Sequence, residues 1–244
     1  MDVTAYLDRI GVSRAATLRE LTVAHQTAVP FENLGIHLGE TISLDPDDLF
    51  DKIVRRRRGG FCYELNGLFA LLLDELGHTV DRVAARVHRG EGRFGPLFDH
   101  LALLVDDAWL VDVGFGRFSS YPLRLDDRAG QSDPGGQFRL ADTPDGDVLV
   151  HRDDAPQYLL ERRPRPLTDF EPACWWQQTW PGSHFRQNPV CSRLDGADRV
   201  TLSARILIRT VAGTRVETVL DSDESLLSAY KTHFGIELDR LPSL

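Results

Sequence analysis

The sequence predicts an α+β fold in which a helical first third is followed by an antiparallel sheet or barrel, then by a strand pair and a final helix. One helix is indicated by apolar residues that recur at three- and four-residue steps, at Leu65, Leu68, Phe69, Leu72 and Leu76. From Val80 the pattern changes to short apolar runs separated by turn residues, which is typical of antiparallel strands.

The first third contains signals for three helices. Thr17 is a suitable N-cap for the first, and Asp45-Pro46 would open the second, which should end at Gly59-Gly60. The third begins at Phe61-Cys62 and ends at Gly77, because glycine is favoured just after a helix C-terminus.

The strands of the sheet or barrel are expected at residues 83–87, 101–105, 109–113, 138–140 and 148–150. Residues 126–136 are rich in Asp, Gly and Pro, which predicts a surface loop. Near the C-terminus, residues 201–209 and 214–219 resemble a hairpin around Ala212-Gly213, and a final helix is expected over 225–233.

Composition argues against nucleic acid and membrane as partners. The formal net charge of −9 is unsuited to a phosphate-binding surface, and we interpret the basic run 55–58 as a solvated helix edge rather than an anion site. The N-terminus shows no signal-peptide pattern, and the longest apolar run, 68–73, is too short to span a bilayer. We therefore expect a cytoplasmic protein.

The three cysteines are too few and too scattered for a disulfide framework, so an odd thiol is a candidate nucleophile. Cys62 lies in the first turn of its helix after two glycines that let the backbone turn sharply. A helix N-terminus lowers the pKa of a thiol, and its amide protons can stabilise an oxyanion. The alternative interpretation is that Cys62 is a small buried apolar residue.

A nucleophilic cysteine needs a histidine as base and an acceptor that orients the histidine. If residues 100–113 form a hairpin around Asp106-Asp107-Ala108, His100 and Asp112 share a face when the loop holds an odd number of residues. Asp99 is a weaker candidate acceptor, because neighbours in a strand point to opposite faces. Asp112 could also be a strand-end carboxylate that binds nearby amides.

Other catalytic signatures are absent from the sequence. The run from Gly114 to Ser119 nearly matches the dinucleotide fingerprint, but no apolar-periodic helix follows it, so we reject that interpretation. The glycines more plausibly let the backbone approach a substrate closely. Serine-hydrolase, phosphate-loop and zinc motifs are missing, so neither serine chemistry nor a metal site is expected.

Four segments of the sequence resemble a known family. The string from Arg58 to Asn66, which reads RGGFCYELN, is similar to the active-site signature of the arylamine N-acetyltransferases. Three further pieces agree in order: VPFENL from Val29 to Leu34, the strand beginning at His100, and DVGFG from Asp112 to Gly116.

This resemblance implies a helical bundle (1–79), a central antiparallel β-barrel (80–182) and a C-terminal α/β lid (183–244) around a papain-like cysteine-enzyme core. It implies a catalytic triad of Cys62, His100 and Asp112. It further implies substrate- or CoA-binding positions, with an aromatic floor from Phe31 and Phe115 and an acyl-CoA approach along Gly114 and Gly116.

Two sets of charged residues are relevant to this resemblance. Arg58, Glu32 and Glu64 could form a supporting ion-pair network or be ordinary surface charges. Asp99 stands where the family often has an uncharged residue, which could bias the protonation of His100.

The implied function is ping-pong transfer of an acetyl group from acetyl-CoA, as co-substrate, to an arylamine, arylhydrazine or similar aromatic amine through an acetyl-cysteine. No tightly bound cofactor is expected. The alternatives are an amide synthase or other acyltransferase acting on a secondary-metabolite acyl chain, a thiol hydrolase, and a non-catalytic binding module. The sequence does not specify the physiological amine, the preferred donor or the oligomeric state.

Overall fold

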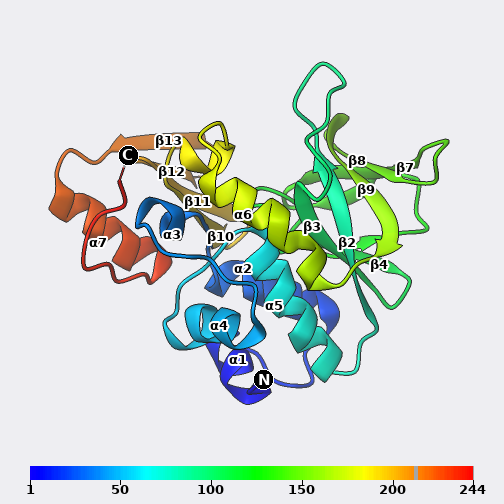
Figure 1. The fold of residues 1–244 in the computed structure, drawn as a ribbon, viewed down its shortest axis with the longest axis horizontal. Coiled ribbons are helices and arrows are strands. Elements are labelled where there is room, and N and C mark those ends of the chain that lie inside the picture. The colour runs from blue at the N-terminus through cyan, green and yellow to red at the C-terminus, as the bar shows by residue number, and fades with distance from the viewer. Residues whose placement is uncertain (212–213, 244) are drawn as a thin grey trace.

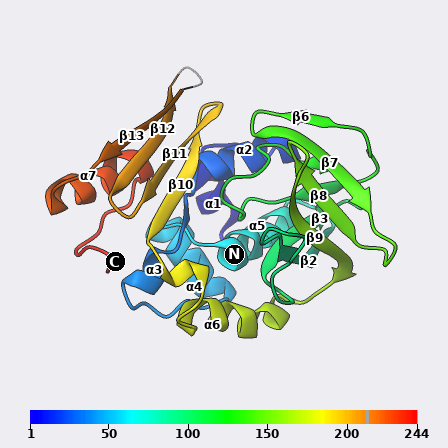
Figure 2. The same cartoon turned by 90° about the horizontal axis from the view of Figure 1, so that it is seen from above.

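The computed structural model describes residues 1–211 and 214–243, which form two antiparallel sheets and the helices around them (Figure 1). In Figure 2 the five-stranded sheet lies to the left and the eight-stranded sheet to the right, with N-terminal helices between them. The helices in chain order are α1 (Val3–Ile10), α2 (Leu18–Ala28), α3 (Leu34–His37), α4 (Pro46–Phe50), α5 (Cys62–Glu75), α6 (Glu171–Thr179) and α7 (Asp223–Phe234).

The three predicted helices begin where the sequence indicates, as α2, α4 and α5, whereas the starts of α1 and of the short α3 were not predicted. Thr17 caps α2, and the Glu20 carboxylate accepts a hydrogen bond from the Thr17 backbone amide at 2.7 Å, which completes a capping box. The chain leaves α5 through Gly77, which adopts φ +95°. The second predicted helix ends earlier than expected, because α4 passes into a π-helical turn over Asp51–Arg55 and stops there.

A buried histidine lies in the core of these helices. His25 of α2 is fully buried, its Nδ1 lies 3.0 Å from the Tyr6 hydroxyl, and its ring centroid lies 4.9 Å from that of Phe69. Burial, with a smaller contribution from the positive charge of Arg9, lowers the pKa of His25 from 6.5 to about 3. The imidazole therefore stays neutral in the folded protein at pH values where the unfolded chain would protonate it.

We expect His25 to make the fold sensitive to acid. Between pH 6.5 and about pH 3 only the unfolded chain takes up this proton, so the free energy of unfolding decreases as the pH falls. At about 1.4 kcal/mol per pH unit, this group removes about 2 kcal/mol between pH 6.5 and pH 5. When the free energy of unfolding is measured in urea at pH 6.5 and at pH 5, its decrease should be about 2 kcal/mol smaller for His25→Gln than for the wild type. Equal losses would contradict this account.

The larger sheet is an almost closed barrel with strand order β5-β4-β3-β2-β9-β8-β7-β6. Its edge strands are connected through one side chain: the Gln131 Oε1 accepts from the Arg124 amide at 2.7 Å, and its Nε2 donates to the Arg124 carbonyl at 3.0 Å. The strands are β2 (Val80–Val87), β3 (His100–Val105), β4 (Trp109–Val111), β5 (Leu123–Arg124), β6 (Gln131–Asp133), β7 (Gly136–Asp142), β8 (Val148–Arg152) and β9 (Ala155–Pro164).

These findings confirm the expected α+β class and the antiparallel barrel. Some details differ from the prediction. β6 lies inside the segment 126–136 that was expected to be a loop, and β4 ends at Val111, before residue 113. β9 was not predicted, although it pairs with both β2 and β8.

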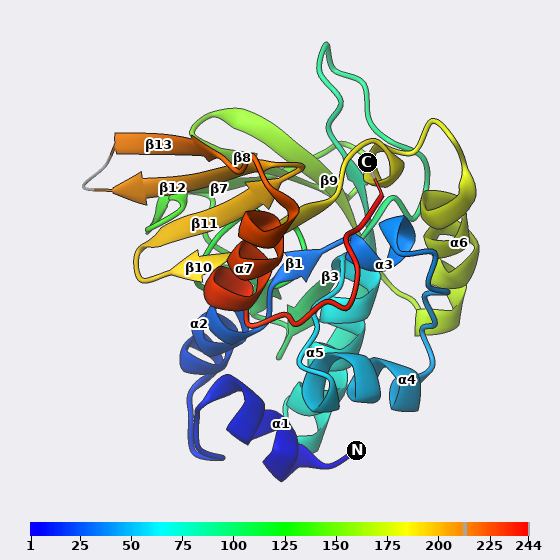
Figure 3. The same ribbon diagram turned by 90° about the vertical axis from the view of Figure 1, so that its left-hand side faces the viewer.

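The smaller sheet has strand order β1-β10-β11-β12-β13, and α7 covers one of its faces (Figure 3). Its strands are β1 (Phe31–Glu32), β10 (Val190–Asp195), β11 (Asp198–Ser203), β12 (Ile206–Val211) and β13 (Thr214–Val219). The single strand predicted over 201–209 is wrong, because the chain turns at Ala204, with φ +49°, between β11 and β12. The turn expected at Ala212-Gly213 lies outside the described residues, although β12 and β13 do pair.

The final helix is confirmed as α7, with Ser222 as its N-cap. Helix α6 was not predicted, and a short 3-10 turn, η3 (His184–Arg186), leads from it toward β10. Within the described part of the chain, no helix combines the length and the apolar character that crossing a membrane requires.

Candidate active site

Cys62 is the first residue of α5, and its position depends on the close approach of two backbone segments. A Cβ on Gly59 would lie 1.8 Å from the Pro30 carbonyl oxygen, and the Glu32 amide donates to the Gly60 carbonyl at 2.8 Å. Neither glycine has a positive φ, so the sharp turn that was expected there does not explain why these positions are glycine. Gly59 has no room for a Cβ beside the Pro30 carbonyl, and a Cβ on Gly60 would lie 2.6 Å from the Glu64 Oε2, so both positions require glycine.

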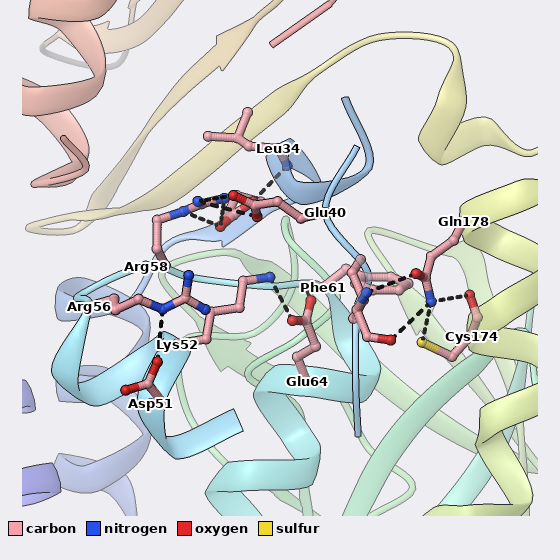
Figure 4. Close-up of polar contacts among 12 residues, drawn as sticks. Leu34, Glu40, Asp51, Lys52, Arg56, Arg58, Phe61, Glu64, Cys174 and Gln178 are labelled. Carbon is pink, nitrogen blue, oxygen red and sulfur yellow. Dashed lines mark hydrogen bonds and ion pairs between the residues drawn. The ribbon is translucent and has the colours of Figure 1, made fainter. Parts of the chain in front are cut away.

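A buried ion-pair network supports the start of α5 (Figure 4). The Lys52 Nζ lies 2.6 Å from the Glu64 Oε1, and the Glu64 Oε2 accepts from the Phe61 amide at 3.2 Å. Arg58 pairs with Glu32 at 3.0 Å. All of these charged side chains are buried, so they form a supporting network and are not ordinary surface charges. The pairing differs from the expectation in one respect, because Glu64 pairs with Lys52 rather than with Arg58.

Loss of Lys52 should be costly, because it leaves the Glu64 carboxylate buried without a cation. We expect Lys52→Met to lower the free energy of unfolding by about 3–5 kcal/mol, and Lys52→Met/Glu64→Gln to recover part of that loss. Arg56→Met, which breaks the exposed pair with Asp51, is the matched control and should have little effect in urea unfolding. Equal effects of Lys52→Met and Arg56→Met would contradict the assignment.

His100 and Asp112 are in contact. Leu103 pairs with Val111 and Val105 with Trp109, so the hairpin loop holds three residues, the odd number that places both side chains on one face. The His100 Nε2 lies 2.7 Å from the Asp112 Oδ2, and both residues are buried. This contact leaves Nδ1 as the ring nitrogen for another partner.

Asn66 connects α5 to this pair, a role that the sequence did not reveal. Its Nδ2 donates to the Asp112 Oδ1 at 2.9 Å and to the Leu101 carbonyl at 2.7 Å, and its Oδ1 accepts from the Val113 amide at 3.0 Å. Asn66 lies four residues after Cys62 and therefore on the same face of the helix. That spacing is the signal that could have identified it.

The environment of Cys62 differs from the expectation. Burial raises the pKa of the Cys62 thiol well above its ordinary value, and the charges of Asp112 and Asp99 raise it further, while a hydrogen bond from the Leu101 backbone lowers it. The predicted lowering of the pKa by the helix N-terminus is therefore wrong, because desolvation outweighs it. The helix carrying Cys62 does pack against the strand carrying His100, as the papain-like core implies.

Cys62 and His100 line one cavity of about 330 Å³. Phe31, Gly114 and Phe115 also line it, and the Phe115 ring meets the His100 ring edge-on with centroids 5.1 Å apart. Gly116 is not a lining residue; it adopts φ +88°, and a Cβ there would lie 3.5 Å from the Phe31 ring.

Part of the cavity wall comes from the segment after α6, which the sequence did not indicate. His184, Phe185 and Asn188 belong to it. The Asn33 side chain holds this segment by donating to the Phe185 carbonyl at 2.8 Å and the Asn188 carbonyl at 2.9 Å.

Asp99 lines the cavity, but the side chains that donate to its carboxylate do not include that of the neighbouring His100. The Asp99 carboxylate accepts from Arg89 at 2.9 Å and from the Gln177 Nε2 at 3.0 Å, which ties the residue just before β3 to α6. Among the described residues, no three His, Cys, Asp or Glu side chains are grouped in a way that could hold a metal ion.

Comparison with known proteins gives a consistent result. The N-acetyltransferase family matches residues 15–242. The arylamine N-acetyltransferase of Mycolicibacterium smegmatis is 36% identical over 99% of this chain and 94% of its own length, and that of Escherichia coli is 34% identical over 96% and 88%.

Solved structures agree. The M. smegmatis arylamine N-acetyltransferase has a TM-score of 0.89 at 35% identity and covers 98% of this chain and 93% of its own. A Mycobacterium marinum arylamine N-acetyltransferase in complex with CoA has a TM-score of 0.88 at 33% identity, with 96% and 93% covered. This chain therefore belongs to the arylamine N-acetyltransferase family and is an acyltransferase.

Proposed function

We propose that the protein transfers an acetyl group from acetyl-CoA to an arylamine, arylhydrazine or similar aromatic amine, in a ping-pong reaction through an acetyl-cysteine at Cys62. The observation that carries this proposal is the cavity lined by both Cys62 and a His100 that is bound to Asp112. Relatives with arylamine N-acetyltransferase activity in their names, one of them solved with CoA, support the choice of donor and acceptor.

In the first half-reaction, Cys62 attacks the thioester carbonyl of acetyl-CoA while its proton passes to the Nδ1 of His100. Transfer of this proton within the site leaves the net charge of Cys62, His100 and Asp112 unchanged. The raised pKa of the Cys62 thiol describes loss of the proton to water, so it does not oppose transfer to His100. Asp112 stabilises the imidazolium that forms. The thiolate of coenzyme A takes the proton from His100 and leaves.

In the second half-reaction, the amine nitrogen attacks the acetyl-cysteine carbonyl. His100 removes the amine proton and returns it to the Cys62 sulfur as the C–S bond breaks. Phe31 and Phe115 provide the aromatic floor for the acceptor, and the backbone of Gly114 and Gly116 borders the path of the acyl donor. These binding roles are part of the proposal.

The division of the chain at residues 79/80 and 182/183 is likewise proposed. It is supported by the position of Cys62 on α5, of His100 on β3 and of the cavity wall after residue 183. Each proposed unit thus contributes to the same site.

The cavity volume bears on the amide-synthase alternative. Ligand pockets measure about 300–1,000 Å³, and the cavity of about 330 Å³ is at the small end of that range. A small cavity favours an acetyl group and a single aromatic ring over a long secondary-metabolite acyl chain.

A donor and acceptor screen that follows coenzyme A release tests the proposal, with Cys62→Ala as the blank. Acetyl-CoA with an aromatic amine or hydrazine should give release that depends on the acceptor and is absent from the blank. Coenzyme A release that is the same with and without an acceptor would be simple hydrolysis and would indicate a thiol hydrolase. No release together with an unreactive Cys62 towards iodoacetamide would indicate a binding module.

A further inference from the structure

The outer edge of the five-stranded sheet is open. β13 is the last strand of that sheet, and in the part of the chain that the structure describes only β12 pairs with it. Helix α7 packs on β10 and β11, farther from this edge. Every residue of β13 is exposed, and in Figure 3 it is the outermost strand of its sheet. An edge strand of this kind offers unpaired backbone groups to another chain.

Apolar side chains are exposed beside this edge. Of the seven large apolar side chains that are exposed among the described residues, three are Ile206, Val216 and Val219 on β12 and β13. Val219 lies directly opposite Ile206, and 62% of its surface is exposed. The edge therefore presents apolar area as well as backbone groups, and both would be stabilised by contact with a partner strand.

The hydrogen-bond pattern shows which backbone groups of β13 point outward. The amide of Leu220, just after β13, donates to the Arg205 carbonyl at 2.8 Å, so these opposite residues form a hydrogen-bonded pair. Hydrogen-bonded and non-hydrogen-bonded pairs alternate along an antiparallel ladder. Every second residue of β13 therefore bonds to β12. The residues between them, which include Arg215 and Glu217, direct their N–H and C=O groups away from the sheet.

The order of side chains in β13 is complementary to itself. When Val216 of one copy lies opposite Val216 of a second, antiparallel copy, Arg215 of each lies opposite Glu217 of the other. Thr214 then lies opposite Thr218. Opposite charges and paired threonines stabilise neighbouring strands. The outward backbone groups of Arg215 and Glu217 also face each other in this register, as a hydrogen-bonded pair requires.

The charges also select this register. Within one chain the Arg215 Nη2 lies 2.5 Å from the Glu217 Oε1, so the charges of two paired copies would alternate in sign along and across the strands. Centring the pair one residue earlier would place Arg215 opposite itself, and centring it one residue later would place Glu217 opposite itself. Like charges directly opposite each other are destabilising.

We propose that two copies of this chain form a dimer by pairing their β13 strands antiparallel, about a two-fold axis at Val216. The two five-stranded sheets then continue into each other. A two-fold axis brings the same patch of both copies together, so the patch must be complementary to itself, as β13 is. Because only one strand of each copy takes part, the interface is small and the dimer forms reversibly.

Sedimentation equilibrium tests the pairing. From about 1 to about 500 µM protein, the wild type should shift from the monomer mass of 27.4 kDa towards twice that mass. Arg215→Glu and Glu217→Arg each place like charges opposite each other, so each should weaken dimerisation at least about tenfold. The double variant Arg215→Glu/Glu217→Arg restores opposite charges and should dimerise within about threefold of the wild type.

A mixture of the two single variants tests the register. One variant carries acidic residues at both 215 and 217, and the other carries basic residues at both. Each should fail to pair with itself, but the two should form a heterodimer with each other. Asp8→Arg on α1 is the matched control, because Asp8 is exposed and the net charge changes as in Glu217→Arg. It should dimerise like the wild type.

A backbone variant keeps the test independent of charge. Glu217→Pro removes an outward N–H and leaves the bonds to β12 in place, so it should weaken dimerisation at least about tenfold. Thermal melting of each variant shows that it is folded. A wild type that stays monomeric throughout overturns the proposal and leaves this edge to a strand of a different protein. A dimer that none of these changes in β13 weakens, or single variants that do not pair when mixed, overturns it as well.

Discussion

Replacing Asp112 with asparagine should reduce kcat/KM for acetyl transfer by about 10³- to 10⁴-fold. The Asp112 Oδ1 accepts hydrogen bonds from the Asn66 Nδ2 and the Gly114 amide, so the carbonyl oxygen of the new side chain must remain at that position. Its NH₂ group would then face the His100 Nε2. That arrangement forces the imidazole proton onto Nδ1, where it can no longer accept the proton of Cys62.

This prediction is checked by steady-state kinetics together with the rate of Cys62 alkylation by iodoacetamide. Both rates should fall, while the melting temperature shows that the fold is retained. Asp107→Asn, in the exposed loop of the same hairpin, is the matched control and should behave like the wild type. A loss of less than tenfold for Asp112→Asn would mean that His100 is not oriented by this carboxylate.

Gly114→Ala should have the second largest effect, through geometry rather than charge. A Cβ at Gly114 would lie 2.7 Å from the Cys62 Cα and 2.8 Å from the Asn66 Nδ2, and the Cys62 backbone cannot move without displacing the start of α5. Overpacking of this kind costs about 1–3 kcal/mol. A displacement of the nucleophile by about 1 Å can lower the rate about 10²-fold.

Urea unfolding and kcat/KM measured on the same preparation test this prediction. Gly130→Ala is the matched control, because among the described residues a Cβ there would meet only the Gln137 Oε1, at 3.5 Å, and its φ is not positive. It should leave both the stability and the activity close to those of the wild type. If Gly114→Ala does the same, the close approach of the two backbones is not required for catalysis.

The parts of the fold that depend on local pattern were predictable. The stripe on α5 and the cap at Thr17 reflect hydrogen bonds and spacings within a few residues, so the sequence indicates them directly. The same is true of the hairpin that brings His100 and Asp112 together, because the parity of a loop decides which residues share a face.

The remaining elements depend on tertiary contacts. The turn at Ala204 has neither glycine nor proline, so nothing in the sequence separates β11 from β12. β6 is short, and it is held in the barrel by its pairing with β7, by the Gln131 side chain and by the Asp133 carboxylate, which accepts from two backbone amides just before β5. The π-helical turn after α4 places Lys52 in the interior beside Glu64, a relation between distant residues that periodicity does not show.

The candidate site likewise combines features that the sequence indicates with features that only the packed structure determines. Cys62 and its partners could be inferred from position and residue type, but the pKa of the Cys62 thiol could not, because it depends on burial that only the packed structure provides. Asn66 and the wall from His184 to Asn188 join the site through contacts across the fold. The role of Gly59 likewise follows only from the position of the Pro30 carbonyl.

Mass spectrometry after incubation with acetyl-CoA in the absence of an acceptor amine tests the central claim most directly. One acetyl group should appear on the peptide containing Cys62, and it should disappear when an aromatic amine is added. The peptides containing the buried thiols Cys174 and Cys191 should remain unmodified. An acetyl-enzyme that persists in Cys62→Ala, or a wild type that turns over without acetylation of Cys62, would contradict the account.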